Sequence, residues 1–347
     1  MKPRALEPLA ARRFVAWVLG LSILLGACMV LAVSVGAGQV SLLDVLDWRG
    51  ALDPVDATIF YQVRLPRVLL AALLGGALAT AGAVFQAILR NPLADPYVLG
   101  VSGGASIGGV LALLAGVGAA GMLGRLGVSA CAFASALAAL FLVERVATVQ
   151  GRLTVYTMLL TGAVFNAFSG AVIYFIQSVA SLEELHAVVF YLMGSVPSLG
   201  YPSIIVLAVL SALALLALLG MARDYNVLSL GEASATQLGV DVEHIKRRTF
   251  LVGSLLTGLA VAAAGLIGFV GLVVPHLLRL ILGPDHRLLV PASFLGGAAF
   301  LVLADLLARW MLAPGELPVG VITALIGGPF FLTLMRRNRG RAPVEVV

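Results

Sequence analysis

Charged residues, lysine and cysteine are all scarce in this sequence. Only 11% of its 347 residues are Asp, Glu, Lys or Arg, whereas 61% are hydrophobic and the mean hydropathy is +1.07. Ordinary soluble domains carry about 25% charged residues, so this composition excludes a soluble fold. The two cysteines, Cys28 and Cys131, both lie inside apolar runs, so we expect no disulfide.

The scarcity of lysine and histidine excludes several kinds of catalytic site. Lys2 and Lys246 are the only lysines, and the Gly-Val-Ser-Gly-Gly run at residues 100–104 is not followed by the Lys-Ser or Lys-Thr of a phosphate-binding loop. We therefore expect the chain not to hydrolyse ATP itself. The histidines are not paired at metal-ligand spacing, so we expect no metal site and no cofactor; they are His186, His244, His276 and His286.

Long apolar stretches are what the sequence has in abundance. A helix needs about 20 apolar residues to cross a membrane. The first candidate is too long for the apolar region of a signal peptide, which runs about 7–15 residues, so we expect it to be retained. The stretches predict an all-α polytopic membrane protein, with residues 1–347 as a single transmembrane domain. The ten candidate spans are 14–36, 65–89, 100–118, 126–146, 154–177, 202–222, 248–266, 267–282, 288–310 and 318–335.

The distribution of basic residues predicts the orientation. With the N-terminus inside, inner segments hold 17 of the 22 basic residues, as expected for cytoplasmic loops. The formal net charge of +5 follows from this bias, so we expect no nucleic-acid partner. An even number of spans then places both termini in the cytoplasm. The basic residues left outside are Arg49, Arg64, Arg67, Arg125 and Arg309.

One polar stretch, residues 226–240, interrupts the apolar pattern for more than a helical turn. Its apolar residues recur at roughly helical spacing, and Gly231 and Gly239 stand where a short helix would turn or stop. The pattern predicts a short helix-turn-helix on the membrane surface, with an apolar face available to a partner.

Two further stretches predict interruptions of the spans. Pro92 and Pro96 end the second span and prevent the helix from resuming at once. The segment from Gly265 to His276 spaces glycines closely before Pro275, which predicts a broken helix packed against its neighbours. We expect His276 to make hydrogen bonds in an inner loop.

Three outer arginines flank predicted spans. Arg64 and Arg67 begin the second span, and Arg309 ends the ninth. Such arginines can snorkel to lipid headgroups, and Asp305 stands four residues before Arg309, so a local ion pair is an alternative. Because arginine is disfavoured on this side of the membrane, docking of an acidic soluble partner explains the three arginines better than snorkelling does.

Taken together, these stretches resemble the FecCD family of permeases, the membrane subunits of ABC importers for iron-siderophores, haem and cobalamin. The resemblance holds in order and spacing over essentially the whole chain. The segments that carry it are Gln62–Arg67, Arg90–Pro96 with Leu99–Ser102, Leu228–Ala233 with Gln237–Gly239, Gly268–His276 and Glu316–Gly320.

The resemblance implies ten transmembrane helices per subunit, in a fold like that of the vitamin B12 permeases (type II ABC importers). It implies a homodimer in the bacterial cytoplasmic (inner) membrane, two ATP-binding-cassette ATPase subunits inside that bind the ATP, and a periplasmic or extracellular substrate-binding protein. Arg64, Arg67 and Arg309 would receive that protein. The residues implied to couple the permease to the ATPase are Leu228, Leu230, Gly231, Glu232, Ala235, Leu238 and Gly239.

The resemblance also implies two cytoplasmic gates. Asn91 and Leu93 match one gate, and Val155 and Tyr156 match the other. The second gate departs from the small hydroxyl residues of the vitamin B12 permeases, so the identity of the substrate does not transfer. We expect a permease that moves a metal chelate (ferric siderophore, haem or cobalamin) by alternating access.

Two other classes of protein remain as alternatives. An ion-gradient-driven secondary transporter would carry ionisable residues inside the bilayer, and here only Asp305 is a convincing case. A membrane-embedded enzyme would need a converging acid, base or metal constellation, which the His, Asp and Glu positions do not form. We therefore expect a transport subunit without its own catalytic site.

Overall fold

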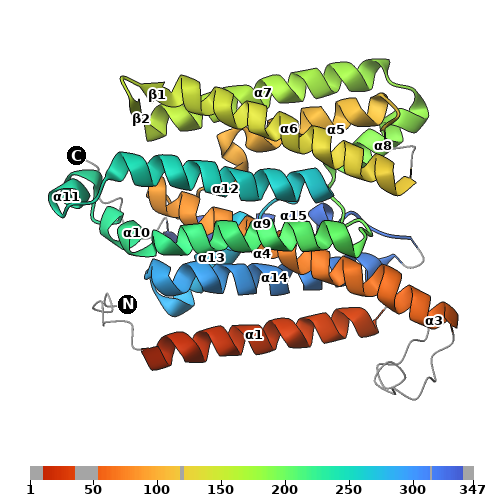
Figure 1. The fold of residues 1–347 in the computed structure, drawn as a ribbon, viewed down its shortest axis with the longest axis horizontal. Coiled ribbons are helices and arrows are strands. Elements are labelled where there is room, and N and C mark those ends of the chain that lie inside the picture. Colours follow the sequence, from red (N-terminus) through yellow and green to blue (C-terminus); the bar gives the residue numbers. More distant parts are fainter. Residues whose placement is uncertain (1–10, 36–53, 118–120, 313–314, 339–347) are drawn as a thin grey trace.

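The computed structural model describes residues 11–35, 54–117, 121–312 and 315–338, and nearly all of them are helical (Figure 1). The exception is a two-stranded antiparallel hairpin, in which Thr148 pairs with Leu153. In chain order the elements are α1 (Ala11–Ser34), α3 (Pro54–Thr58), a π-helix (Ile59–Arg64), α4 (Leu65–Ile88), a 3-10 helix (Pro96–Leu99), α5 (Val101–Leu114), α6 (Gly121–Ala147), β1 (Thr148–Val149), β2 (Arg152–Leu153), α7 (Val155–Val179), α8 (Leu182–Leu192), α9 (Tyr201–Gly220), α10 (Ala222–Leu228), α11 (Glu232–Gln237), α12 (Val242–Ala264), α13 (Val270–Leu282), α14 (His286–Met311) and α15 (Val319–Asn338).

Seven helices are long and apolar enough to cross a membrane, and α5, α13 and α15 are shorter apolar helices. These elements fall on the ten predicted stretches, while the count of ten spans stays a prediction. The second predicted stretch, 65–89, coincides with α4. The continuous apolar helix is longer than that stretch and runs from Val55 to Ile88, because a π-helical turn joins α3 to α4 without a break.

Helix α4 is the central element of the bundle and is buried along almost all of its length. Its small residues allow neighbouring helices to approach closely: a Cβ at Gly75 would overlap the backbone of Gly297 in α14, and one at Gly82 would overlap Gly271 in α13. Close approach of this kind replaces the hydrophobic drive that is missing in lipid. The core is therefore built around α4, with α12, α13 and α14 packed on it.

The predicted helix break is present between α12 and α13. Gly265 and Phe269 have positive φ values of 72° and 67°, and α13 begins at Val270. Pro275 lies inside α13 and has no N–H to donate to the carbonyl of Gly271, four residues earlier. Gln86 Nε2 donates to that oxygen at 3.3 Å, so a side chain of α4 satisfies the group that the proline frees.

The bundle has two distinct ends (Figure 1). The hairpin, α10 and α11 lie at one end, which we call the α11 end, together with the start of α1. Helices α3 and α8 lie at the other, which we call the α3 end. Helix α8 was not predicted from the sequence, although Ser181 and Glu184 form the reciprocal capping box that marks a helix start.

Candidate functional site

The predicted helix-turn-helix is present at the α11 end as α10, a turn, and α11. The turn depends on Gly231, whose φ of 109° is rarely adopted by other residues, and Gly239, with φ of 84°, follows the second helix. Tyr225 and Leu228 are buried beneath the element, and Tyr225 Oη lies 2.8 Å from Thr249 Oγ1 of α12. The element is thus seated on the bundle rather than detached from it.

A polar cluster fixes α10 to the start of α14. Asn226 Nδ2 donates to Asp285 Oδ1 at 2.7 Å, and Asn226 Oδ1 accepts from the backbone N–H of His286 at 2.8 Å. Burial acts to raise the pKa of Asp285, but hydrogen bonds from the Arg287 side chain and from Asn226 outweigh it and lower the pKa to about 2. Asp285 is therefore ionised at neutral pH and holds α10 through Asn226.

The seven residues predicted to meet an ATPase fall into three groups. Leu230 and Leu238 are 61% and 65% exposed, and Gly239 is also exposed. Leu228 and Ala235 are buried and hold the element to the bundle. Between these two groups lie Gly231, in the turn, and Glu232, which pairs with Lys246 of α12 at 2.6 Å. An apolar surface free for a partner is therefore limited to the turn and the end of α11.

The first predicted gate lies in residues 90–95, between α4 and the 3-10 helix. Asn91 is exposed, and its Oδ1 accepts from the backbone N–H of Leu93 at 3.0 Å, so the two form a local turn. The guanidinium of Arg90 lies next to Gly231, since a Cβ built there would be 3.7 Å from Arg90 Nη1. This gate segment therefore lies close to the turn between α10 and α11.

The second predicted gate lies at the start of α7, directly after the hairpin. Tyr156 is 74% exposed and Val155 is partly buried. The backbone N–H of Leu153, two residues before Val155, donates to Glu243 Oε1 at 2.6 Å. A cavity of about 850 Å³ separates this segment from α11, and Val155, Tyr156, Glu232, Glu243 and Lys246 are among its lining residues. Both predicted gates thus lie at the same end of the bundle as the exposed leucines.

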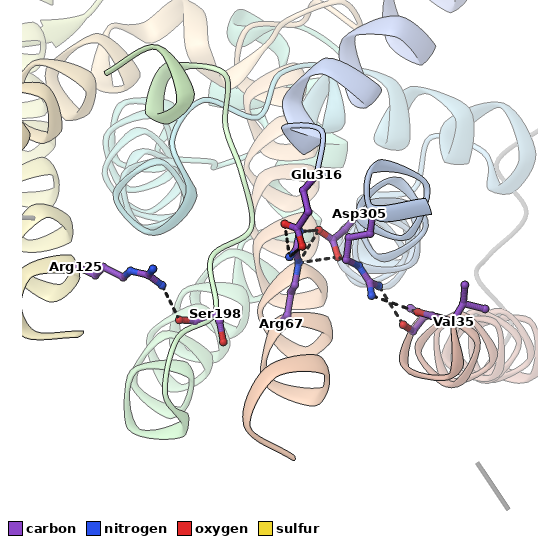
Figure 2. Close-up of polar contacts among 8 residues, drawn as sticks. Val35, Arg67, Arg125, Ser198, Asp305 and Glu316 are labelled. Carbon is purple, nitrogen blue, oxygen red and sulfur yellow. Dashed lines mark hydrogen bonds and ion pairs between the residues drawn. The ribbon is translucent and has the colours of Figure 1, made fainter. Parts of the chain in front are cut away.

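The three outer arginines lie at the α3 end, and each has partners within the chain. Asp305 is 1% exposed and pairs with Arg67 and with Arg309, each at 3.0 Å (Figure 2). Arg67 also pairs with Glu316 at 2.8 Å. The local Asp305–Arg309 pair considered from the sequence is present, whereas the contribution of Arg67 was not foreseen.

Arg309 and Arg64 also hold the end of α1. Arg309 Nη2 donates to the carbonyl of Ala32 at 3.0 Å, and Arg64 Nη1 donates to that of Val33 at 3.2 Å. Carbonyls in the last turn of a helix lack backbone donors, and cations there also complement the helix dipole. In this conformation the arginines therefore join α1 to α4 and α14.

Arg125 differs from the other described outer arginines. It is exposed, and it donates only to the carbonyl of Ser198, at 3.4 Å, away from the Asp305 cluster (Figure 2). Among the residues that the structure describes, no carboxylate pairs with it. Arg49, the fifth outer arginine, lies outside the described residues.

Several residues that organise these sites were not singled out as site residues from the sequence. Gln86, Glu243 and Lys246 lie in or beside apolar helices, and an isolated polar residue there is the signal that was available. Gln86 holds the first gate segment, because its Nε2 donates to the carbonyl of Ala94 at 3.4 Å while its Oε1 accepts from Arg279 at 2.8 Å. Within the described part of the chain, no group of three His, Cys, Asp or Glu side chains could hold a metal ion.

Comparison with known proteins places the chain among membrane transport subunits. Residues 23–337 match the FecCD transport family. An uncharacterised ABC transporter permease of Bacillus subtilis is 43% identical over 94% of this chain and 95% of its own. A cobalamin import permease of Halobacterium salinarum is 45% identical over 81% of this chain and 74% of its own, and a hemin transport permease of Yersinia pestis is 38% identical over 91% and 96%.

Two solved structures share the fold. One, assigned to an inward-facing metal-chelate type ABC transporter, has a TM-score of 0.80 and 31% identity, and covers 93% of this chain and 99% of its own. A chain of a Streptococcus pneumoniae complex has a TM-score of 0.52 and 18% identity, covers 80% of this chain and 92% of its own, and therefore indicates the fold alone.

Proposed function

Because the chain belongs to the FecCD transport family, we propose that it moves a metal chelate across the bacterial cytoplasmic membrane by alternating access. The chain is the permease of an ABC importer and a multi-pass membrane protein; it is not itself an enzyme. Members of this family work with ATPase and substrate-binding partners. The finer points are our inference: a homodimer of single-domain permeases with both termini in the cytoplasm, two separate subunits that bind and hydrolyse ATP, and one binding protein outside.

The observation that carries this proposal is the exposed apolar surface at the α11 end. Leu230 and Leu238 remain exposed on a short element whose other side is buried, and Gly239 lies beside them. Apolar side chains gathered on a polar end of a membrane protein mark a contact with another protein. We infer that this surface seats in the ATPase, with Leu230 and Leu238 as its apolar contacts.

Alternating access requires that the ATPase bias two states of the permease. ATP binding changes the ATPase, and only a difference in its binding to the two states can shift their populations. The α10–α11 turn lies beside Arg90 of the first gate segment, so a shift of the turn is in a position to move Asn91 and Leu93. Val155 and Tyr156 would form the opposing gate.

The class of substrate is inferred from the relatives. They include permeases named for cobalamin and for hemin, and a metal-chelate type transporter. We infer a large amphiphilic chelate: a ferric siderophore, haem or cobalamin. An apolar pathway that binds such a molecule weakly suits transport, because a tight site would retain it.

We propose that the binding protein docks at the arginine cluster of Arg64, Arg67 and Arg309. Three guanidinium groups gather there: Asp305 pairs with Arg67 and Arg309, Glu316 pairs with Arg67, and Asp56 interacts with the charge of Arg64. Glu316 is 57% exposed, so a carboxylate of the partner can replace it on Arg67 without disturbing buried Asp305. Charge pairs of this kind guide association and weaken with salt.

Charge removal on either side of the Arg67–Glu316 pair tests the docking proposal. We expect Arg67→Gln to weaken association with the binding protein about tenfold, or 1.4 kcal/mol, and Glu316→Gln to strengthen it. Arg125→Gln is the matched control at the same end of the bundle. Unchanged association in Arg67→Gln would contradict the docking role.

The coupling proposal is tested by a charge placed on the exposed leucines. Leu230→Asp should abolish co-purification of the ATPase and ATP-driven uptake, because the ionised carboxylate would be buried at the interface. The fold should remain intact, since Leu230 is exposed and surface substitutions usually change stability by about 0.5 kcal/mol or less. Leu182→Asp, at an exposed position of the α3 end, is the control.

Stability measurements separate loss of coupling from loss of fold. Leu228→Ala should destabilise the protein by about 2–5 kcal/mol because this side chain is buried, whereas Leu230→Ala should not. Full ATP-driven uptake by the Leu230→Asp variant would contradict the proposal. The substrate is then identified by binding of cyanocobalamin, hemin and a ferric hydroxamate siderophore to the cognate binding protein.

The ion-gradient-driven transporter is the second candidate. The buried carboxylate of Asp305 is its best support, but both of its flanking arginines neutralise it. Uptake by the reconstituted permease under a proton or sodium gradient, without ATPase subunits, would favour this candidate over ours.

A further inference from the structure

Two parts of the α11 end need to communicate in the proposed function. Helix α11 carries part of the proposed ATPase surface, and residues 155–156 form the second gate. An open pocket of about 850 Å³ lies between them. Ala235 of α11 and Leu153 before the gate belong to one hydrophobic cluster, and polar contacts provide a second, more directional route.

That route is visible on one face of α12. Glu243 and Lys246 are three residues apart in its first two turns, so their side chains lie on the same face. Lys246 points to α11, where its Nζ lies 2.6 Å from Glu232 Oε1. Glu243 points to the hairpin, where its Oε1 accepts from the backbone N–H of Leu153 at 2.6 Å.

Both contacts are of the strong, charge-assisted kind. Lys246 is 6% exposed, and Glu232 is its ion-pair partner within the described part of the chain. Removing one partner of a buried pair leaves the other charge uncompensated, so α11 and α12 are held together. The contact at Leu153 joins a carboxylate to a backbone donor, which fixes the chain two residues before Val155.

We propose that Glu232, Lys246 and Glu243 form a relay that transmits movement of α11 to the gate at Val155 and Tyr156. The relay rests on the proposed function, because it assigns a route to the coupling that the ATPase is proposed to drive. These three are positioning residues: they touch neither ATP nor the chelate. Together with Arg90, which reaches the first gate, they connect one short element to both gates of the same subunit.

The test follows the gate directly and needs no substrate. Cys28 and Cys131 are replaced by serine, and spin labels are attached at Tyr156→Cys and at Leu216→Cys, an exposed position on α9. The permease is purified in complex with its ATPase subunits and placed in nanodiscs. The distance between the labels is measured without nucleotide and with ATP and vanadate, and ATP hydrolysis and ATPase content are measured in the same samples.

We expect ATP and vanadate to shift the distance, and Lys246→Met and Glu243→Ala each to remove most of the shift while the ATPase stays bound and active. Glu232→Gln, at a residue of the proposed ATPase surface, should remove most of the shift as well. Glu243→Gln keeps an acceptor oxygen for Leu153 and should retain the shift. The charge-swapped pair Glu232→Lys with Lys246→Glu should restore it. Arg247→Gln, which breaks the neighbouring pair with Glu144 (3.0 Å), is the matched control and should leave the shift unchanged.

The outcomes separate the relay from the function on which it rests. If the unsubstituted complex shows no shift or holds no ATPase, the proposed function fails. If that complex shifts and the Glu232→Gln and Glu243→Ala variants shift equally with ATPase bound, the relay alone is refuted. Glu232 is partly exposed, so its glutamine variant folds even if the buried Lys246→Met variant does not.

Discussion

Asp305 illustrates how single charged residues are accommodated inside this bundle. An isolated carboxylate in an apolar interior carries a penalty of several kcal/mol, and here Arg67 and Arg309 remove it with contacts of 3.0 Å each. The same Arg309 donates to the carbonyl of Ala32, so one cluster joins three helices. The buried part of the cluster is structural, and its exposed part, Glu316, is where a partner can compete.

This division predicts very different effects for the two carboxylates. Asp305→Asn should lower the free energy of unfolding by about 3–5 kcal/mol, because it leaves two arginines without their buried counter-charge. Glu316→Gln should lower it by at most about 1 kcal/mol, since Glu316 is exposed. Thermal unfolding of both variants in one detergent measures the difference, and equal effects would contradict a buried structural role for Asp305.

Asp95 makes stability depend on pH in a direction unusual for a carboxylate. It lies beside the first predicted gate and starts the 3-10 helix, with Oδ1 accepting from the Tyr97 N–H at 2.8 Å. Burial raises the pKa of Asp95 to about 6 against the lowering effect of that N–H. A raised carboxylate pKa stabilises the fold below the ordinary value, near 4, and this stability is lost as pH rises through 6.

Asp95→Asn should therefore be more stable than the unsubstituted protein at pH 7, by up to about 3 kcal/mol, and equal to it near pH 4. Asp285→Asn is the opposite case. The pKa of Asp285 is lowered to about 2, so its contribution is present above pH 4 and is lost only as pH falls through 2. Unfolding temperatures of Asp95→Asn and of the unsubstituted protein, measured at several pH values between 4 and 7, test the Asp95 prediction. An Asp95→Asn variant less stable than the unsubstituted protein at pH 7 would contradict the raised pKa of Asp95.

The α10–α11 element shows how far local sequence reasoning reaches. Glycines at 231 and 239 predicted the turn and the end of the second helix, because few other residues adopt positive φ. Which leucines face outward was not predictable from the same pattern. Leu228 and Leu230 are two positions apart in the sequence, and only the packing of α10 on α14 and α4 makes the first buried and the second exposed.

The arginine cluster shows what local sequence reasoning does not predict, namely contacts between residues far apart in the sequence. The Asp305–Arg309 pair could be proposed because residues four apart meet on a helix. The Arg67–Asp305 contact joins residues 238 positions apart, and no periodicity in one sequence predicts it. The extension of the second helix back to Val55 was likewise not predicted, since a π-helical turn leaves no apolar signature that differs from an α-helix.

Glycines at helix crossings give a prediction at the scale of whole elements. A methyl group at Gly82 would overlap the carbonyl of Gly271, so Gly82→Ala should separate α4 from α13 and destabilise the protein by about 1–3 kcal/mol or more. Gly26→Ala, in α1, meets no atom within 4 Å and should be neutral or stabilising by up to about 1 kcal/mol. If Gly82→Ala left the unfolding temperature unchanged or raised it while Gly26→Ala lowered it, α4 and α13 would not pack as described.

The outward faces of the whole bundle are strongly apolar. Along α7, the side chains of Phe168, Tyr174 and Phe175 are exposed, and most of α9 is also uncovered. Surfaces of this extent are covered by lipid or by another protein. In the proposed homodimer, part of this surface would be buried against a second copy and the remainder would face the bilayer.

At the level of the whole molecule, we propose that a separate ATPase binds the α10–α11 surface and drives the two gates. The most direct measurement is site-specific crosslinking in the assembled complex, with a photoreactive probe on Leu230→Cys or Leu238→Cys in a chain in which Cys28 and Cys131 are replaced by serine. We predict crosslinks to the ATPase from both positions and none from Leu182→Cys at the α3 end. A complex that hydrolyses ATP and takes up its chelate while positions 230 and 238 yield no ATPase crosslink would contradict the account.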